Sequence, residues 1–197
     1  MGQRGRIKGS NGEERRAMLL EVAAEEFANH GFHDTKVSTI VKRANVTQPT
    51  FYLYFQNKEA IFQELIQLFR QRLADLTKNS RLEPDVQHSL SENIKKGLRE
   101  IFTFFNQNPF LTKIGFFTDT DAEEVKRLMA AQVKSNLEAE VKLGYFQQDL
   151  DMDTVANSLV GTIERLTLTK LFTKQKTPDE LAEEIVQLFL FGLKIED

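Results

Sequence analysis

Residues 37–58 constrain the fold most, because they suit two short helices joined by one tight turn. Asn45 tolerates the left-handed backbone conformation that such a turn requires. Thr47 can cap the second helix, and Pro49 in its first turn lacks an N–H that would have no helical partner there. We therefore predict a helix-turn-helix whose first helix covers residues 38–44 and whose second helix begins at Thr47.

The rest of the chain carries start and stop signals for further helices and no strand pattern. Gly31 can end a first helix, and Thr177 followed by Pro178 and two acids can begin the last one. Apolar residues repeat with the helical period in between. We predict an all-α fold of about nine helices, with long helices over 13–30, 58–78, 84–108, 121–142, 153–172 and 177–194, and a short apolar segment over 110–117.

Composition excludes several classes of protein. The chain has no Cys, which excludes a disulfide framework and a cysteine zinc site. No apolar run approaches the roughly 20 residues that a membrane-spanning helix needs. The basic N-terminus lacks the apolar region of a signal peptide. We expect a cytoplasmic protein with no membrane contact and no cofactor.

The charge is divided unevenly along a chain whose net charge is −3. Residues 1–58 hold 9 Lys and Arg against 6 Asp and Glu, which gives +3, and the remaining residues hold 17 against 23, which gives −6. Non-specific DNA affinity depends on the local positive charge that faces the phosphates. The division therefore favours DNA binding by the N-terminal part, and a chance excess of surface Lys and Arg is the alternative.

At this point the sequence resembles the TetR family of bacterial transcription regulators. The match lies within residues 23–59, and the positions that carry it are Ala23, Phe27, Gly31, Phe32, Thr35, Val37, Ile40, Ala44, Val46, Thr47, Thr50, Tyr52, Tyr54, Phe55, Lys58 and Glu59. The resemblance implies a homodimeric repressor that a small molecule releases from DNA. It also implies three parts: a disordered basic arm over 1–12, a helix-turn-helix DNA-binding domain over 13–58, and a helical effector-binding and dimerisation domain over 59–197.

The resemblance places the DNA contacts around the second helix of the motif. It implies base contacts at the front of that helix and phosphate contacts around it. Phe51 and Phe55, four residues apart, should share a buried face, so Tyr52 and Tyr54 should point elsewhere. Lys36 stands where the family usually has Ser or Thr, and its ammonium can contact a phosphate instead. The expected contacts to double-stranded DNA are Thr35, Lys36, Thr39, Thr47, Gln48, Pro49, Thr50, Tyr52, Tyr54 and Lys58.

The C-terminal part is rich in Phe where the family places its ligand cavity. We expect an aromatic-walled pocket for an apolar or flat small-molecule effector. A well-filled core is the alternative explanation for any single Phe. The candidate pocket residues are Phe102, Phe105, Phe110, Phe116 and Phe117.

The last two helices have long apolar faces that fit a four-helix bundle between two copies of the chain. Burial inside one subunit is the alternative. The candidate interface residues are Leu159, Ile163, Leu166, Ile185, Leu188 and Phe189.

Asp149, Asp151 and Asp153 are spaced like the start of a calcium loop, but the Gly and Glu that such a loop needs are absent. We expect Asp153 to cap the next helix instead.

The sequence therefore predicts a ligand-responsive repressor that binds a near-palindromic operator as a homodimer. The main alternative is an activator or other DNA-binding protein without an effector. A helical enzyme is least supported, because the sequence shows no thiol, histidine cluster, phosphate loop or convincing acid pair.

Overall fold

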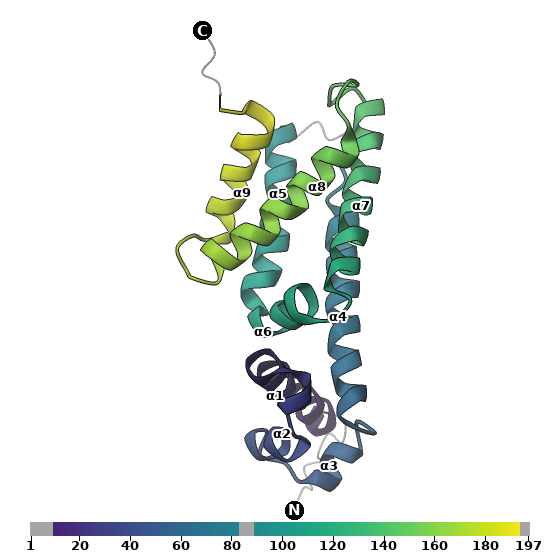
Figure 1. Ribbon diagram of the computed structural model, residues 1–197, viewed down its shortest axis with the longest axis vertical. Helices are drawn as coiled ribbons and strands as arrows, with labels where there is room; N and C mark the ends of the chain where they lie inside the picture. The colour runs from purple at the N-terminus through teal and green to yellow at the C-terminus, as the bar shows by residue number, and fades with distance from the viewer. Residues whose placement is uncertain (1–9, 83–88, 194–197) are drawn as a thin grey trace, which may run out of the picture.

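The computed structural model describes residues 10–82 and 89–193, and these residues form helices without strands (Figure 1). The all-α prediction is confirmed. Three helices run on into a π-helical turn, written η. The elements are α1 (Ser10–Asp34), α2 (Val37–Arg43), α3 (Gln48–Tyr52), α4 (Lys58–Asn79), α5 (Leu90–Gln107), α6 (Pro109–Thr112), η1 (Lys113–Thr118), α7 (Ala122–Lys142), α8 (Met152–Leu166), η2 (Thr167–Leu171), α9 (Pro178–Val186) and η3 (Gln187–Phe191).

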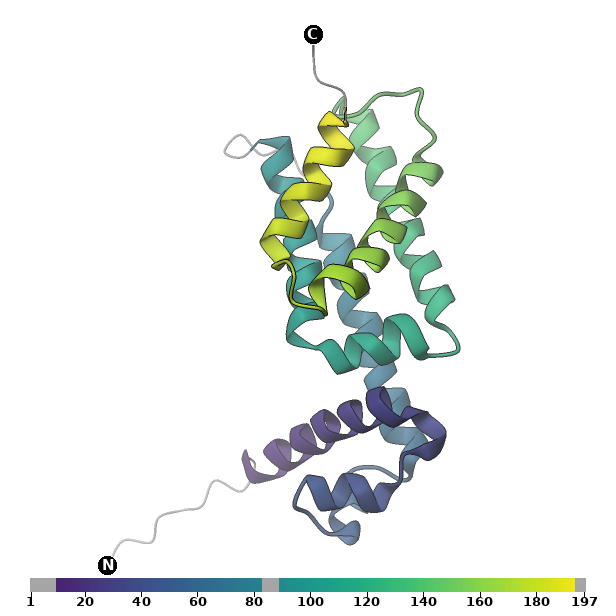
Figure 2. The same cartoon turned by 60° about the vertical axis from the view of Figure 1, so that its left-hand side comes forward.

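The elements form two parts that share α4. Helices α1, α2 and α3 gather around the first turns of α4, and we call them the head. Helices α5 and α7 pack along the rest of α4, and α8 and α9 lie against α7 and α5, which gives a larger C-terminal domain (Figures 1 and 2). No helix within the described ranges is both long and apolar enough to cross a bilayer.

Side-chain caps fix where the helices begin. Thr47, Asn57, Ser89 and Thr177 each accept a hydrogen bond from a backbone N–H in the first turn of the next helix. The predicted cap at Asp153 is wrong, because the carboxylate of Asp151 accepts the N–H groups that open α8.

The first helix differs from the prediction at both ends. Gly31 has the expected positive φ of 77°, but helical turns continue as far as Asp34 after this kink. Residues 10–12 belong to α1 although they were expected in the disordered arm, and the rest of that arm lies outside the described residues. Residues 84–88 of the predicted fifth helix also lie outside them, and its described part begins at Leu90.

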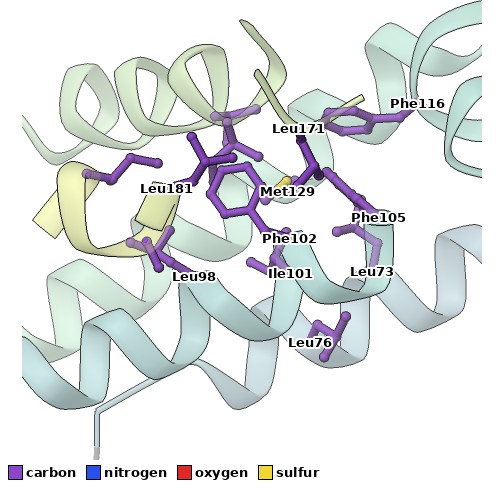
Figure 3. Packing of buried hydrophobic residues seen from close by; sticks show 14 of the residues in the cluster. Leu73, Leu76, Leu98, Ile101, Phe102, Phe105, Phe116, Met129, Leu171 and Leu181 are labelled. Atoms are coloured by element: carbon purple, nitrogen blue, oxygen red, sulfur yellow. The ribbon is translucent and has the colours of Figure 1, made fainter. Parts of the chain in front are cut away.

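Each part has its own apolar core. The head core includes Phe27, Ile40, Phe51 and Phe55. The core of the C-terminal domain is built from α4, α5, α7, α8 and α9, and Figure 3 shows its side chains packed against one another. Because α4 contributes residues to both cores, the two parts are tied together by one continuous helix.

The segment α6–η1 is a second connection between the two cores. It lies directly on α1, with Ile114 in the head core and Phe116 in the other. Gly115 between them allows η1 to pack closely on α4, because a Cβ here would lie 2.6 Å from Cγ of Phe69. Arg70 on α4 also pairs with Asp119, directly after η1, at 2.9 Å.

Substituting Gly115 by Ala should therefore lower the free energy of unfolding by about 1–3 kcal/mol, because the buried Phe69 ring must move to admit the methyl group. Urea unfolding followed by circular dichroism measures this change. Gly12→Ala on α1 is the matched control, because a Cβ there meets only the Tyr54 hydroxyl at 3.6 Å, an ordinary van der Waals distance. A Gly115→Ala protein as stable as the control would contradict close packing at this position.

Candidate DNA interface and effector-binding region

Helix α3 presents its first residues to solvent. Gln48 and Pro49 are exposed, and Thr50 is half-buried. The Thr47 hydroxyl accepts the Thr50 N–H at 3.4 Å and lies 2.9 Å from the Thr50 hydroxyl, so the cap also orients that side chain. Tyr52 is 54% exposed. We call Gln48, Pro49, Thr50 and Tyr52 the recognition face.

A tightly bonded turn holds the recognition face in place. Asn45 takes the left-handed conformation with φ 51°, as the sequence predicts. The N–H of Val46 donates to Val41 at 3.0 Å and closes the turn. Phe51 within α3 and Phe55 just after it are buried in the head core, and the Phe51 ring contacts the exposed Tyr52 ring edge to face. The orientation of α3 is therefore set by the head core.

Leu53, which the sequence reasoning did not single out, is 81% exposed directly after α3. The sequence offers only its place between Tyr52 and Tyr54, outside the buried face of Phe51 and Phe55.

The predicted phosphate-contacting residues around α2 differ in exposure. Lys36 precedes α2, is exposed, and makes no side-chain capping bond. Thr39 is half-buried on the first turn. Arg43 is held away from this edge, because it pairs with Glu25 at 2.6 Å and Glu26 at 2.5 Å. Lys36 is thus the cation best placed to meet a phosphate at the start of α2.

The predicted DNA contact of Thr35 has to be corrected. Its side chain is 2% exposed, and its hydroxyl donates to the Gly31 carbonyl at 2.7 Å. This bond closes the last turn of α1 after the kink. The structure therefore leaves the Thr35 side chain no surface with which to contact DNA.

Lys58 also has a different role from the predicted one. Its ammonium donates to the carbonyls of Phe32 at 2.7 Å, His33 at 3.2 Å and Thr35 at 3.0 Å, and lies 4.5 Å from the centre of the Phe32 ring. An ammonium has three donors, and here all three have carbonyl partners. Lys58 therefore caps the C-terminal end of α1, and a phosphate contact would require it to give up one of these bonds.

Tyr54 is half-buried and packs against the head core. Its hydroxyl lies close to Gly12 in the first turn of α1. Part of the Tyr54 ring stays exposed and is available for a DNA contact beside the recognition face.

Replacing Lys58 by Met should lower the free energy of unfolding by about 1–3 kcal/mol, because several backbone carbonyls lose a charged donor. Urea unfolding measures the effect. Lys42→Met, an exposed position on α2, is the matched control and should change stability little. Equal stability of the two variants would contradict the capping role of Lys58.

The predicted effector pocket is wrong for three of its five residues. Phe102, Phe105 and Phe116 are fully buried and pack against one another and their neighbours (Figure 3). Phe117 is partly buried against the same core, and Phe110 is 37% exposed. The alternative of a well-filled core is therefore correct for this cluster, because the rings fill the space between α4, α5 and η1.

An open apolar pocket lies elsewhere, at the end of the C-terminal domain farthest from the head. Its volume is about 650 Å³, and α5, the α7–α8 connection, α8 and α9 line it. We call it the distal pocket. Its apolar wall is formed by Leu90, Ile94, Tyr145, Phe146, Leu150, Met152, Val155 and Phe189, among others.

Two polar side chains of α7, Asn136 and Glu140, form hydrogen bonds to the end of α4 and to the residues that follow it. Asn136 donates to the Thr77 carbonyl at 2.9 Å, and Glu140 accepts the Leu82 N–H at 2.8 Å. Glu140 is only 4% exposed, and its burial raises the pKa of its carboxyl above the ordinary value of 4.5. These bonds tie the end of α4 to α7.

The raised pKa of Glu140 makes the free energy of unfolding depend on pH, and the direction of this change follows from the direction of the pKa shift. The native state holds this proton more tightly than the unfolded chain, so its stabilising effect is present below the ordinary pKa and is lost as pH rises through the raised one. Glu140→Gln keeps an acceptor for Leu82 and cannot ionise. Its stability relative to the parent should therefore rise between acidic and neutral pH, as measured by urea unfolding. A constant difference would contradict the raised pKa.

The predicted dimer residues fall into three groups by their exposure. Ile163 and Ile185 are 1% and 2% exposed in the core of one chain, so the prediction is wrong for them. Leu159 and Leu166 are partly buried against the same core. Leu188 and Phe189 remain exposed on η3, and Leu168 on η2 is exposed as well.

Comparison with known proteins agrees with this geometry. The sequence model of the bacterial regulatory proteins of the tetR family matches residues 19–65, which cover the motif and the start of α4. The Bacillus subtilis protein named uncharacterized HTH-type transcriptional regulator YdgC is 49% identical over 185 residues, which cover 93% of this chain and 95% of that protein. The fatty acid metabolism regulator protein of the same organism is 24% identical over 187 residues, 89% of this chain and 93% of its own length.

Solved structures show the same fold. The fatty acid degradation regulator FadR from Bacillus halodurans has a TM-score of 0.71 at 24% identity, covering 97% of this chain and 100% of that one. FadR from Bacillus subtilis, solved in complex with stearoyl-CoA, has a TM-score of 0.68 at 22% identity, covering 91% and 100%. The chain therefore belongs to the TetR family and is a transcriptional regulator with a helix-turn-helix.

Proposed function

We propose that this regulator is a repressor that binds a near-palindromic operator as a homodimer and is released by a small apolar effector. The observation that carries the proposal is the exposed recognition face on a helix whose other side is anchored in the head core. The major groove of DNA can accommodate a short exposed helix that the rest of the domain holds at a fixed angle.

The recognition face would meet the bases. The Gln48 amide can pair with an adenine edge, and the Thr50 methyl can pack on a thymine methyl. Pro49 makes the tip stiff and neutral, and Tyr52 extends the face along the groove. Lys36, Thr39, Thr47 and Tyr54 would contact phosphates on either side and set the register.

A homodimer would use the outward faces of the last two helices. Leu168, Leu188 and Phe191 are 42%, 45% and 62% exposed there. Gly161 on α8 leaves open space at its surface, so a second helix can approach closely. These residues replace Ile163 and Ile185 in the proposed interface, and pairing through a two-fold axis would place two recognition faces on one side of the DNA.

The effector would enter the distal pocket rather than the packed Phe cluster. Its volume lies within the range of about 300–1,000 Å³ that is usual for small-molecule sites. Two relatives support an apolar, long-chain effector: one is named a fatty acid metabolism regulator, and the other was solved with stearoyl-CoA.

A DNA-binding regulator without an effector is the second candidate. The observation that favours it is the fully packed cluster of Phe102, Phe105 and Phe116, where the family resemblance implied a cavity.

The DNA-binding proposal is tested with an operator selected from random duplexes, and affinities are measured by fluorescence anisotropy at each of several salt concentrations. Gln48→Ala should weaken binding to the selected operator by about 1–3 kcal/mol and leave non-specific binding almost unchanged. Lys36→Ala should weaken both and reduce the salt dependence. Gln107→Ala, an exposed position on α5, is the control. An unaffected Gln48→Ala protein would refute base contact by this residue.

The dimer proposal is tested by size-exclusion chromatography with light scattering. Leu168→Glu combined with Leu188→Glu should give a folded monomer, because two charges would be buried at the two-fold interface without partners. Leu128→Glu on α7, also an exposed leucine, is the control and should remain dimeric. A parent protein that is monomeric, or a double variant that still dimerises, would overturn this interface.

A further inference from the structure

Two further hollows adjoin the distal pocket. A narrow one of about 90 Å³, which we call the neck, shares Ile94, Leu98, Leu137, Phe146 and Leu159 with it. The neck runs inward between α5, α7 and α8. It is mostly apolar, so a hydrocarbon chain that starts in the distal pocket can continue through it.

On its other side the neck adjoins a polar hollow of about 750 Å³, which we call the basic mouth. Ser80, Leu82, Gly97 and Asn136 line both. The shared lining places the distal pocket, the neck and the basic mouth next to one another across the domain, and we call this series the path; it is apolar at one end and polar at the other.

The polar end carries excess positive charge. Lys78, Arg81 and Lys96 line the basic mouth against the single carboxylate of Glu100. None of these three cations makes an ion pair within the part of the chain that the structure describes. Asn79, Asn93 and Gln132 add amides to the same wall. A mouth of this composition attracts an anion that can accept several hydrogen bonds.

We propose that this path binds one anionic amphiphile, with its hydrocarbon chain in the distal pocket and neck and its carboxylate or phosphate at the basic mouth. The inference rests on the proposed function and deepens it, because it names the chemical class of the effector. Glu140 in the neck accepts the Leu82 N–H and interacts electrostatically with Arg81, so it offsets part of the charge of that one cation and leaves Lys78 and Lys96 for the head group.

The charge of the mouth distinguishes this occupant from others. A neutral apolar molecule would fill the distal pocket and leave three cations unused. A second copy of the chain could cover the exposed Phe189 and Phe191 at the rim, but it would not account for a basic opening at the far end of the path.

Binding is measured by calorimetry on the full-length protein without DNA, with probes below their micelle concentrations. Two anionic probes should bind: laurate, which carries a carboxylate, and lauroyl-CoA, which carries phosphates. Dodecyltrimethylammonium, which has a similar hydrocarbon chain and the opposite charge, should bind at least about tenfold more weakly. Affinity should rise about fourfold for each methylene added between octanoate and laurate. Tighter binding of laurate identifies a carboxylate site, and tighter binding of lauroyl-CoA identifies a phosphate site.

Variants locate the two ends of the ligand. Arg81→Gln with Lys96→Gln should weaken laurate binding about tenfold, whereas Lys113→Gln with Lys174→Gln, two exposed lysines elsewhere, should not change it. Val155→Trp fills the distal pocket and should abolish binding, and thermal unfolding checks that it folds.

Three outcomes would overturn the inference: equal affinity for the cationic probe, unchanged affinity of the Arg81 and Lys96 variant, or a folded Val155→Trp protein that binds as the parent does. Operator affinity is measured separately. Laurate that binds as described but does not release the operator would refute the effector role and leave the site standing, so the two failures are distinguishable.

Discussion

The contact of η1 with α4 and α1 is the interaction on which the arrangement of the two parts depends. Ile114 and Phe116, two residues apart, belong to different cores. Gly115 between them lets the turn press against the Phe69 ring, and the Arg70–Asp119 pair holds its end. Because packed cores resist continuous deformation, a shift of the C-terminal core at this point has to move the head or break the packing.

Helix α4 links the proposed ligand site to the DNA-binding head in a second way. Lys78, at its last turn, lines the basic mouth, and Asn57 and Lys58, at its first, hold the helix start and the end of α1. A ligand that binds one position of α4 better than another shifts the population of head orientations. The ligand can release DNA only to the extent that it binds one position of α4 more tightly than the other.

The parts of the fold that depend on neighbouring residues could be predicted from the sequence. Asn45, Thr47 and Thr177 act locally, and the turn and caps they predicted are present. Residues whose role depends on tertiary packing could not be assigned. The helical period marks Phe102 and Ile163 as inward-facing, but it does not say whether the space beside them is filled, hollow or shared with a second chain. The capping role of Lys58 was not predictable for the same reason, because the carbonyls that it binds lie 23 or more residues away in the sequence.

The central claim is that binding in the C-terminal domain changes the separation of two DNA-binding heads. The chain has no Cys, so Gln63→Cys, exposed on α4, gives one spin label per chain and one distance between protomers. Electron–electron double resonance would measure that distance with operator duplex and after adding laurate. We predict a narrow distribution on DNA that shifts or broadens when laurate releases the operator. Release with an unchanged distribution, or no distance between protomers at all, would contradict the account.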